Sequence, residues 1–261
     1  MSNRRRGPVA PRAALKKGGF SSIIKLVMHQ SRKALVLFSG GIDSTTALYW
    51  AQGRYAEVSA LSFDYGQRHR VELALARRLA RRLRLPHKVL KFDLRQVGGS
   101  ALTDPSVSVP RIMGQEDIGP GVPATYVPFR NGIFLALAAA WAEAKGSNDI
   151  ICGFNTIDSP NYPDTRASFV RAMQRAVDLG TGAAAKGRRL WIVAPFIRMK
   201  KSEIIRLGLS LGADYSLSIS CYGGREVPCR RCSSCLLRER AWDEAGTKDH
   251  LFTRLRKEGK I

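Results

Sequence analysis

The amino-acid sequence predicts an α/β fold: a doubly wound parallel sheet followed by a small C-terminal cysteine module. Apolar runs of strand length alternate with helical patterns from Lys33 onward, an order typical of parallel sheets with helices on both faces. The length of 261 residues suits one such domain with an appendage. We expect three parts: a flexible basic extension (1–32), an α/β domain (33–215), and a cysteine module with a C-terminal helix (216–261).

The hydrophobic pattern places the elements in order along the chain. Strands are expected over residues 34–38, 57–63, 88–92, 149–154 and 190–194, and helices over 44–52, 67–84, 131–145, 166–179 and 201–211. In the second helix an apolar residue recurs every fourth position, which predicts a buried stripe with the arginines pointing outward; its members are Val71, Leu75, Leu79 and Leu83. The third helix is apolar almost all round, so we expect it to be deeply buried. The five prolines of 94–128 indicate a long functional or mobile loop.

The net charge of +22 is large, and residues 1–33 contribute nine Lys/Arg without any Asp or Glu. Such a field attracts nucleotides, nucleic acid or an acidic protein partner. A solvated face is the simpler interpretation for most arginines of 67–84. Lys25 interrupts the only apolar stretch near the N-terminus, and no run has transmembrane length, so we expect a cytoplasmic protein without a membrane segment.

The segment Ser39-Gly-Gly-Ile-Asp-Ser-Thr-Thr46 joins the first strand to the first helix. Two glycines let backbone N–H groups approach a phosphate, and the helix N-terminus adds a positive dipole end. Asp43 suits a helix cap or a Mg²⁺ ligand. The lysine of a Walker A loop is missing. The pattern is typical of PP-loop ATP pyrophosphatases, with an ordinary tight turn as the alternative.

Polar clusters follow other strands at their carboxyl ends, where ligands bind in doubly wound sheets. They are residues 64–68, 155–164 and 195–201. Together with the glycine loop they predict one site on this edge of the sheet.

Four cysteines at short spacing form the second strong motif: Cys221, Cys229, Cys232 and Cys235. Four thiolates close a tetrahedral shell, which favours a structural Zn²⁺ site, with an Fe–S cluster as the alternative. Cys152 lies in an apolar strand and is expected to be a core residue.

Taken together, these motifs resemble the QueC family of 7-cyano-7-deazaguanine synthases. The matching segments are Phe38–Thr46, Phe63-Asp-Tyr-Gly-Gln-Arg-His69, Val127-Pro-Phe-Arg-Asn131, Asn161–Arg166, Lys201–Ile204 and the cysteine cluster. The resemblance implies an adenine nucleotide alpha hydrolase-like PP-loop fold and a homodimer. It also implies use of ATP and Mg²⁺ to convert 7-carboxy-7-deazaguanine and ammonia to a nitrile through an adenylate and an amide.

The resemblance also implies roles for individual residues. Asp43, Lys201 and Arg130 are expected to be catalytic. The ATP-binding set is Phe38, Ser39, Gly40, Gly41, Asp43, Ser44, Thr45, Thr46 and Asn131. The substrate-binding set is Asp64, Tyr65, Gln67, Arg68, Asp158, Tyr162, Asp164 and Arg166, in which an arginine pairs with the substrate carboxylate.

The chain departs from the family pattern at Phe129, where a small residue is usual, and at Thr165, where Cys is usual. The basic extension is also unusual. Three alternatives therefore stay open. A QueC-like enzyme could join the deazaguanine to a protein or nucleic-acid amine, for example in antiviral defence. The chain could instead be a PP-loop tRNA-modifying enzyme, or a nucleic-acid-binding protein without catalysis.

Overall fold

The structure, a computed structural model, describes residues 31–110, 121–156 and 161–261. Most of the basic extension and the predicted substrate residue Asp158 therefore lie outside the described residues. Within the described ranges no helix is long and apolar enough to cross a membrane.

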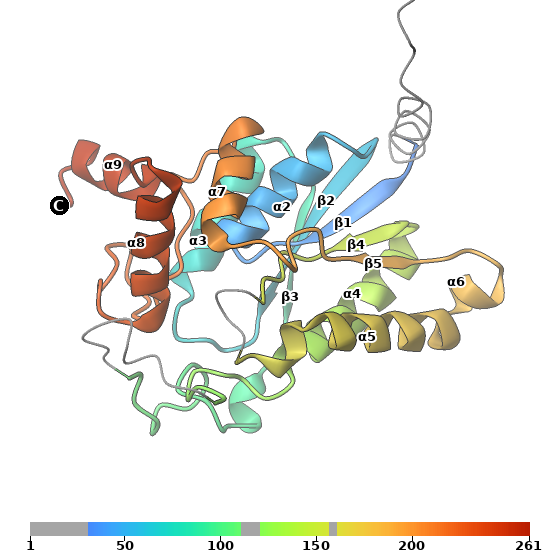
Figure 1. Cartoon of the computed structure of the whole chain (residues 1–261). Coiled ribbons are helices and arrows are strands. Elements are labelled where there is room, and N and C mark those ends of the chain that lie inside the picture. The colour runs from blue at the N-terminus through green and yellow to red at the C-terminus, as the bar shows by residue number, and fades with distance from the viewer. Residues whose placement is uncertain (1–30, 111–120, 157–160) are drawn as a thin grey trace, which may run out of the picture.

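Five parallel strands form one sheet in the order β3-β2-β1-β4-β5, which confirms the predicted doubly wound arrangement (Figure 1). The strands are β1 (Lys33–Leu37), β2 (Glu57–Asp64), β3 (His87–Lys91), β4 (Asp149–Ile151) and β5 (Trp191–Val193). The chain runs outward from β1 to β3 and then returns to pair β4 with the other side of β1. This change of direction opens a crevice between the carboxyl ends of β1 and β4.

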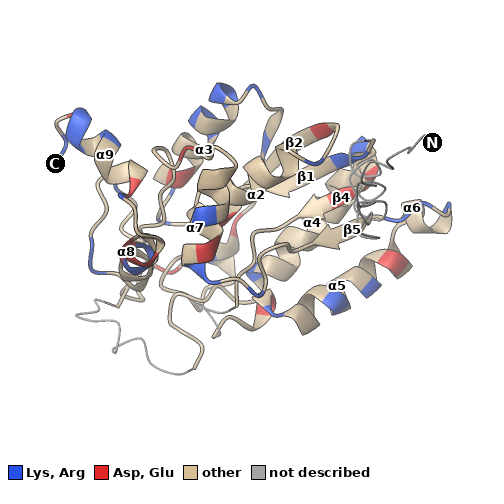
Figure 2. Ribbon diagram, turned by 45° about the horizontal axis from the view of Figure 1, so that its top comes forward, with Lys and Arg blue, Asp and Glu red and all other residues tan. Residues whose placement is uncertain are grey.

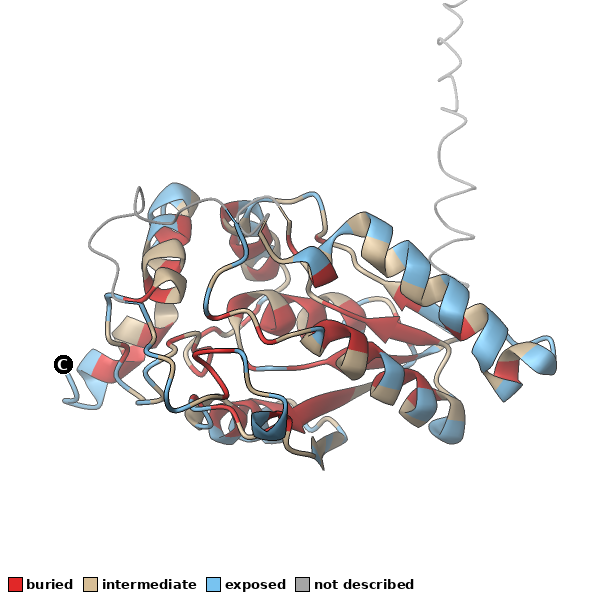
Figure 3. Cartoon of the chain, turned by 90° about the horizontal axis from the view of Figure 1, so that it is seen from below, coloured by how far each residue is buried: buried red, intermediate tan, exposed pale blue. Residues whose placement is uncertain are grey.

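Helices cover both faces of the sheet (Figure 1). On one face lie α2 (Ile42–Gln52), α3 (Val71–Arg82) and α7 (Lys201–Ser210), and on the other α4 (Arg130–Lys145) and α5 (Ala167–Gly180). Alternate residues of β1 serve the two faces, because Val36 packs into the first core while Leu35 and Leu37 pack into the second. Figure 3 shows the buried residues gathered in the strands and on the inner sides of the helices.

The remaining elements are short or C-terminal. They are η1 (Leu94–Gln96), η3 (Pro163–Thr165), α6 (Gly182–Ala185), α8 (Ser233–Ala245) and α9 (His250–Lys257). Two helices thus end the chain where one was expected. Arg238 of α8 holds them together, because its guanidinium donates to both carboxylate oxygens of Asp249 at 2.6 and 2.8 Å, just before α9.

Two expectations about the helices need correction. The helix α3 begins at Val71 rather than at 67, because the Gln67 side chain bonds to the backbone of the preceding loop. The helix α4 is not buried all round: Ala136, Ala140 and Ala144 are exposed, since alanine is small enough to face solvent at little cost.

The predicted stripe of α3 is partly confirmed. Leu75 and Leu79 are buried, whereas Val71 and Leu83 at its two ends are half-buried. The arginines of this helix are exposed, as expected. Figure 2 shows Lys and Arg on outer helices such as α5 and α9, while the strands at the sheet centre carry few of them.

Candidate active site

A pocket of about 660 Å³ lies at the carboxyl ends of β1, β2 and β4. Its volume falls within the range of about 300–1,000 Å³ that is usual for small-molecule sites. The walls come from the glycine loop, the start of α3, the start of α4, the segment after β4, and the cysteine module. The predicted edge of the sheet therefore carries one site, at the point where the strand order reverses.

The glycine loop is held by its own hydroxyl groups. Ser44 Oγ accepts from the Gly40 N–H at 3.2 Å and donates to the Gly41 carbonyl at 3.1 Å, and Ser39 Oγ accepts from the Gly41 N–H at 3.3 Å. No side chain caps the N-terminus of α2. Its first N–H groups and positive dipole end therefore remain available to an anion in the pocket.

Two glycines let the surrounding backbone approach this loop. Gly40 has a φ of +87°, and a Cβ there would lie 3.1 Å from the Glu72 carbonyl oxygen. A Cβ at Gly153, after β4, would lie 2.8 Å from the Asp43 backbone carbonyl. Sequence reasoning identified Gly40 but missed Gly153, because only the β1–β4 pairing brings the latter beside the loop.

Lys201, at the start of α7, points into the same region. Its Nζ lies 2.6 Å from Asp43 Oδ2, and both side chains are mostly buried. The other carboxylate oxygen of Asp43, Oδ1, is buried without a hydrogen-bond partner among the described residues. The end of the pocket beside the glycine loop, where the sequence predicts the phosphates of ATP, thus contains a paired lysine and a carboxylate with one unsatisfied oxygen.

The opposite end contains the guanidinium of Arg130. One nitrogen donates to Tyr65 Oη at 3.2 Å, and the group lies 5.9 Å from the Tyr65 ring centroid and 5.7 Å from that of Phe134. Burial by itself would lower the pKa of Arg130, but nearby Tyr65, Asp164 and Tyr222 raise it above its ordinary value. Arg130 therefore stays charged beside the pocket and contacts a neutral phenol rather than a carboxylate.

Two tyrosines from distant segments complete this end. Tyr162 Oη lies 3.1 Å from Thr125 Oγ1 and 3.5 Å from Tyr222 Oη. Burial raises the pKa of Tyr222 well above its usual value, so its hydroxyl remains a neutral donor. The tyrosines line the pocket with groups that both donate and accept hydrogen bonds.

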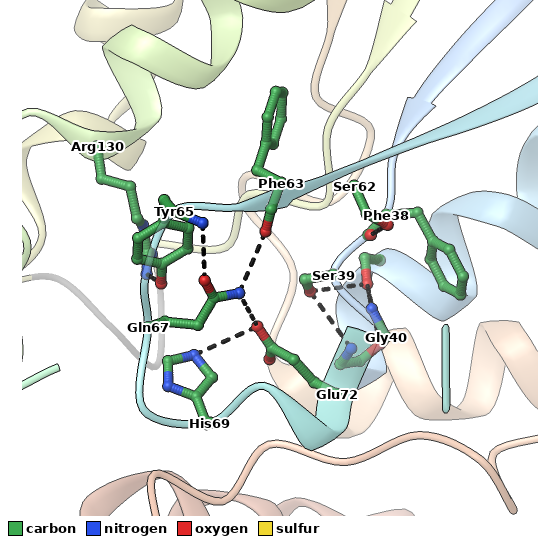
Figure 4. Close-up of polar contacts among 12 residues, drawn as sticks. Phe38, Ser39, Gly40, Ser62, Phe63, Tyr65, Gln67, His69, Glu72 and Arg130 are labelled. Carbon is green, nitrogen blue, oxygen red and sulfur yellow. Dashed lines mark hydrogen bonds and ion pairs between the residues drawn. The ribbon is translucent and has the colours of Figure 1, made fainter. Parts of the chain in front are cut away.

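A polar network lies between the two ends (Figure 4). Glu72 Oε1 is 3.4 Å from Gln67 Nε2 and 3.3 Å from His69 Nε2, while Gln67 also bonds to the backbone of Phe63 and Tyr65. Glu72 and His69 line the pocket, and neither was among the predicted site residues. In the sequence, His69 stands out only as the last residue of the Phe63–His69 segment, and Glu72 only because it follows His69 by three positions.

The structure brings many of the predicted residues together and leaves others outside. Those that line the pocket are Phe38, Ser39, Gly41, Asp43, Ser44, Tyr65, Arg130, Asn131, Tyr162 and Lys201. Those outside its lining are Gly40, Thr45, Thr46, Asp64, Gln67, Arg68, Asp164 and Arg166.

Most residues outside the lining have structural contacts. Thr46 Oγ1 is 2.7 Å from Tyr215 Oη, on the side of α2 that packs against the C-terminal region. The sequence predicted that this hydroxyl would contact ATP, but it points away from the pocket. Asp64 accepts from Arg70 at 2.5 Å, and Arg68 donates to the Asp104 carbonyl at 2.8 Å. Thr45 is fully buried, and its hydroxyl has no partner among the described residues.

The loop before α5 also differs from expectation. Asp164 is buried and accepts the backbone N–H of Asn131 at 2.9 Å, so it fixes the start of α4 instead of facing the pocket. Arg166 is exposed at the N-cap of α5. Among the arginines predicted as site residues, Arg130 is therefore the one that lines the pocket, because the fold turns α4 and not α5 toward the site.

The two departures from the family pattern differ in position. Phe129 precedes α4 with a φ of 51°, a left-handed conformation that is strained for a bulky residue, and its exposed ring packs edge-on against Phe169. Thr165 lines the pocket and donates to the Tyr162 carbonyl at 2.9 Å. Only Thr165 stands at a position where it contacts the site.

The four clustered cysteines form a candidate metal centre beside the pocket. Their sulfur atoms all lie within 4.8 Å of one another, near the spacing of about 3.8 Å expected when four thiolates surround Zn²⁺ at about 2.3 Å. The N–H groups of Gly223 and Cys229 donate to Cys221 Sγ, which favours its thiolate form. The centre shapes the pocket, because Tyr222 and Ser233 lie next to its ligands and line the wall.

Comparison with known proteins gives a matching family model and relatives of similar length. Residues 33–246 match the family model described as queuosine biosynthesis protein QueC. The chain is similar to the 7-cyano-7-deazaguanine synthase of Saccharophagus degradans, 45% identical over 84% of this chain and 96% of the relative. It is 46% identical to the synthase of Nostoc punctiforme, over 84% and 98%. Among solved structures, a 4-thiouridine synthetase–RNA complex with bound ATP aligns over 82% of this chain and 50% of the other, at 20% identity and a TM-score of 0.45.

Proposed function

Because the chain belongs to the QueC family of queuosine biosynthesis proteins, we propose that it converts 7-carboxy-7-deazaguanine and ammonia into 7-cyano-7-deazaguanine with ATP. The observation that carries this proposal is that one pocket contains both an uncapped helix N-terminus and a buried, charged arginine. The first feature suits the phosphates of ATP, and the second suits a carboxylate. A reaction that transfers AMP to a carboxylate needs both in one cavity.

At the phosphate end, Ser39, Gly41 and Ser44 hold the pyrophosphate portion of ATP with backbone and hydroxyl donors. Lys201 adds a positive charge once a phosphate competes with Asp43 for it. Donors fixed before the reaction stabilise the charge that develops on the leaving pyrophosphate. Asn131 and Phe38 complete the nucleotide contacts.

At the other end, Arg130 and Tyr65 bind the substrate carboxylate. A carboxylate is a poor electrophile, and its attack on the α-phosphate requires that it be held in line with the departing pyrophosphate. A guanidinium that has no carboxylate hydrogen-bond partner among the described residues is suited to this task. Tyr162 and Tyr222 then face the deazapurine ring system.

Two metal ions belong to this proposal. The unsatisfied carboxylate oxygen of Asp43 fits a Mg²⁺ ion carried by ATP, which neutralises phosphate charge. The four thiolates fit Zn²⁺, which supplies folding energy to the C-terminal module and leaves no position open for substrate.

The cellular location and the partners of the chain are inferred from its cysteines and its charge. A cluster of four cysteines that serve as metal ligands rather than as disulfides suits a reducing compartment, so we place the reaction in the cytoplasm. A homodimer, and an acidic protein or nucleic-acid partner for the basic extension, remain predictions. Light scattering of the purified chain, with and without RNA, tests both.

The direct test is mass spectrometry of the products formed from carboxy-deazaguanine, ATP, Mg²⁺ and ammonia. We expect the amide as an intermediate and the nitrile as the product, with a nucleotide product whose formation depends on the deazaguanine. Absence of nucleotide turnover with this substrate contradicts the proposal. A mass increase on a macromolecule without nitrile formation identifies a different acceptor.

A further inference from the structure

Glu72 places a carboxylate inside a pocket proposed to bind two anions. Its side chain is 13% exposed and lines the pocket. Asp43 and Glu72 are the two acidic residues of the described lining, and Asp43 is paired with Lys201. A negative group near ATP and a substrate carboxylate is unfavourable unless a positive species also binds there.

The two oxygen atoms of this carboxylate have different surroundings. Oε1 is close to both Gln67 Nε2 and His69 Nε2. No residue in the described ranges donates to Oε2, and this atom is not among the buried atoms that lack a partner. One oxygen therefore fixes the orientation of the group, and the other is open to a ligand.

The position of Glu72 is also informative. It lies between the Ser39–Gly40 loop and the Tyr65–Arg130 pair (Figure 4). The first turn of α3, which carries it, packs against Gly40, as the short distance from a Cβ at Gly40 to the Glu72 carbonyl indicates. In the proposed reaction, the adenylated carbonyl forms between these two ends.

We propose that Glu72 is the catalytic residue that receives ammonium and removes its protons, an inference that rests on the proposed function. Ammonia in neutral water is mainly ammonium, which has no lone pair and cannot attack a carbonyl. Glu72 Oε2 binds this cation and accepts one of its protons, while contacts to Oε1 hold the carboxylate in place. The cation also explains why a carboxylate is tolerated beside two anions.

Glu72 accepts the protons that the nitrogen releases at each step of the reaction. Ammonium gives one proton to Oε2, and the free nitrogen attacks the carbonyl carbon. The carbon–oxygen bond to AMP then breaks, and the nitrogen loses a second proton to give the amide. After a second ATP adenylates the amide oxygen, two N–H protons leave in turn as that carbon–oxygen bond breaks, which gives the nitrile and AMP. Protons pass from Glu72 to solvent between steps.

Gln67 and His69 act as positioning residues, because they contact Glu72 rather than the reacting atoms. His69 Nε2 lies 3.3 Å from Oε1, so glutamine at this position keeps a nitrogen donor at similar reach. Alanine removes it and frees the carboxylate to rotate toward other partners.

The test is the Glu72→Gln variant of the full chain, measured in three assays with carboxy-deazaguanine. The first is ATP–pyrophosphate exchange, which reports adenylate formation. The second is amide and nitrile formation from ammonium. The third is hydroxamate formation from hydroxylamine, a nucleophile that is largely unprotonated at neutral pH. Glu57→Gln, an exposed carboxylate at the start of β2 that pairs with Lys33, is the matched control.

We expect Glu72→Gln to lower ammonium-dependent product formation by about a hundredfold to ten-thousandfold, the usual contribution of a general base. Pyrophosphate exchange and hydroxamate formation should persist. His69→Ala should lower the ammonium-dependent rate, and His69→Gln should restore most of it. Glu57→Gln should behave as the unaltered protein.

Other outcomes overturn the inference. Loss of pyrophosphate exchange in Glu72→Gln would show that this residue serves ATP or its metal ion instead. Full ammonium-dependent activity would show that another group removes the protons. If the unaltered protein shows no exchange with carboxy-deazaguanine, both the proposed function and this inference fail.

Discussion

The two ends of the pocket are built in different ways. At the phosphate end, the side-chain hydrogen bonds of the glycine loop join residues two to five positions apart. At the carboxylate end, the bonds join Arg130 to Tyr65 across 65 positions, Tyr162 to Thr125 across 37, and Tyr162 to Tyr222 across 60. The glycine loop is therefore local in sequence, although Lys201 reaches its Asp43 from 158 positions away, whereas the other end exists only when distant segments are in place.

This difference predicts different kinds of sensitivity. A local loop keeps its shape as long as its own residues and the adjoining strand and helix are intact. An end assembled from α4, the loop before α5 and the cysteine module fails when any one of them shifts. Substitutions at the two ends, and in the module that supports one of them, therefore test the comparison.

The largest effect is expected from the cysteine module. Cys232→Ser removes one of four ligands, and we expect the metal content to fall from about one ion per chain to near zero, with loss of nitrile formation and a lower unfolding temperature. The buried Cys152, outside the cluster, provides the control Cys152→Ala, which should retain the metal. Elemental analysis with thermal unfolding measures both. Full metal content in Cys232→Ser would contradict the assignment of a metal centre.

The next effect concerns the assembled end itself. Arg130→Met should lower kcat/KM for the deazaguanine carboxylate by about a hundredfold to a thousandfold, about 2.7–4 kcal/mol, and leave ATP affinity nearly unchanged. Arg166→Met, at an exposed arginine of the predicted substrate-binding set, should change kcat/KM by less than about threefold, as is usual for surface positions. Steady-state kinetics with each substrate varied separates the two. The reverse ranking would assign the substrate carboxylate to Arg166 instead of Arg130.

A smaller effect is expected at the local end. Gly40→Ala introduces a Cβ at a positive φ and against the Glu72 carbonyl, so the loop must shift and kcat/KM for ATP should fall by about tenfold to a hundredfold. Gly212 has a similar φ of +76° with nothing within 4 Å of its Cβ position. Gly212→Ala should therefore carry only the backbone strain, about 1–2 kcal/mol of stability, and keep its activity. Equal activity losses in both variants would mean that strain, and not contact with the loop, is responsible.

The smallest effect concerns the support beneath the local end. Ser62 Oγ donates to the Phe38 carbonyl and lies 2.7 Å from His87 Nε2. Burial, with a contribution from Arg77, lowers the pKa of His87 from 6.5 to about 4. The unfolded chain thus binds a proton more readily than the folded one, so the contribution of His87 to stability is complete above pH 6.5 and is lost as the pH falls toward 4.

His87→Gln should therefore flatten the dependence of unfolding free energy on pH between 6.5 and 4. Urea unfolding at pH 7 and pH 5 measures the slope, and Arg189→Gln, at an exposed ion pair on another segment, serves as the control. An unchanged slope in His87→Gln would contradict the lowered pKa.

Local patterns predicted much of this molecule. All five strands were expected within a few residues of their observed bounds, because buried strands read as short apolar runs. The glycine loop and the cysteine cluster were both identified, since each depends on spacing over a few residues. The start of α3 was missed, because the bonds from Gln67 to the Phe63 and Tyr65 backbone compete with helix formation in a way that periodicity does not reveal.

The site residues also divide into those that a local pattern predicted and those that it did not. Phe38, Ser39, Asp43 and Ser44 line the pocket as expected, because a strand, a glycine turn and a helix start leave little choice of direction. Glu72 and Gly153 were missed, and Asp164 and Arg166 were expected to face the substrate although neither lines the pocket. Which side of a helix faces the pocket depends on how that helix packs.

The sequence by itself therefore determined the fold class, the phosphate loop and the four thiolates, because each rests on interactions within a short stretch of chain. Only the tertiary structure decided that Arg130 stands at the end of the pocket opposite the glycine loop, that Glu72 lies between the two ends, and that Tyr222 of the cysteine module forms part of the wall. These positions follow from the β3-β2-β1-β4-β5 order and from packing across the sheet. Contacts between segments far apart in the chain leave no local pattern from which they can be predicted.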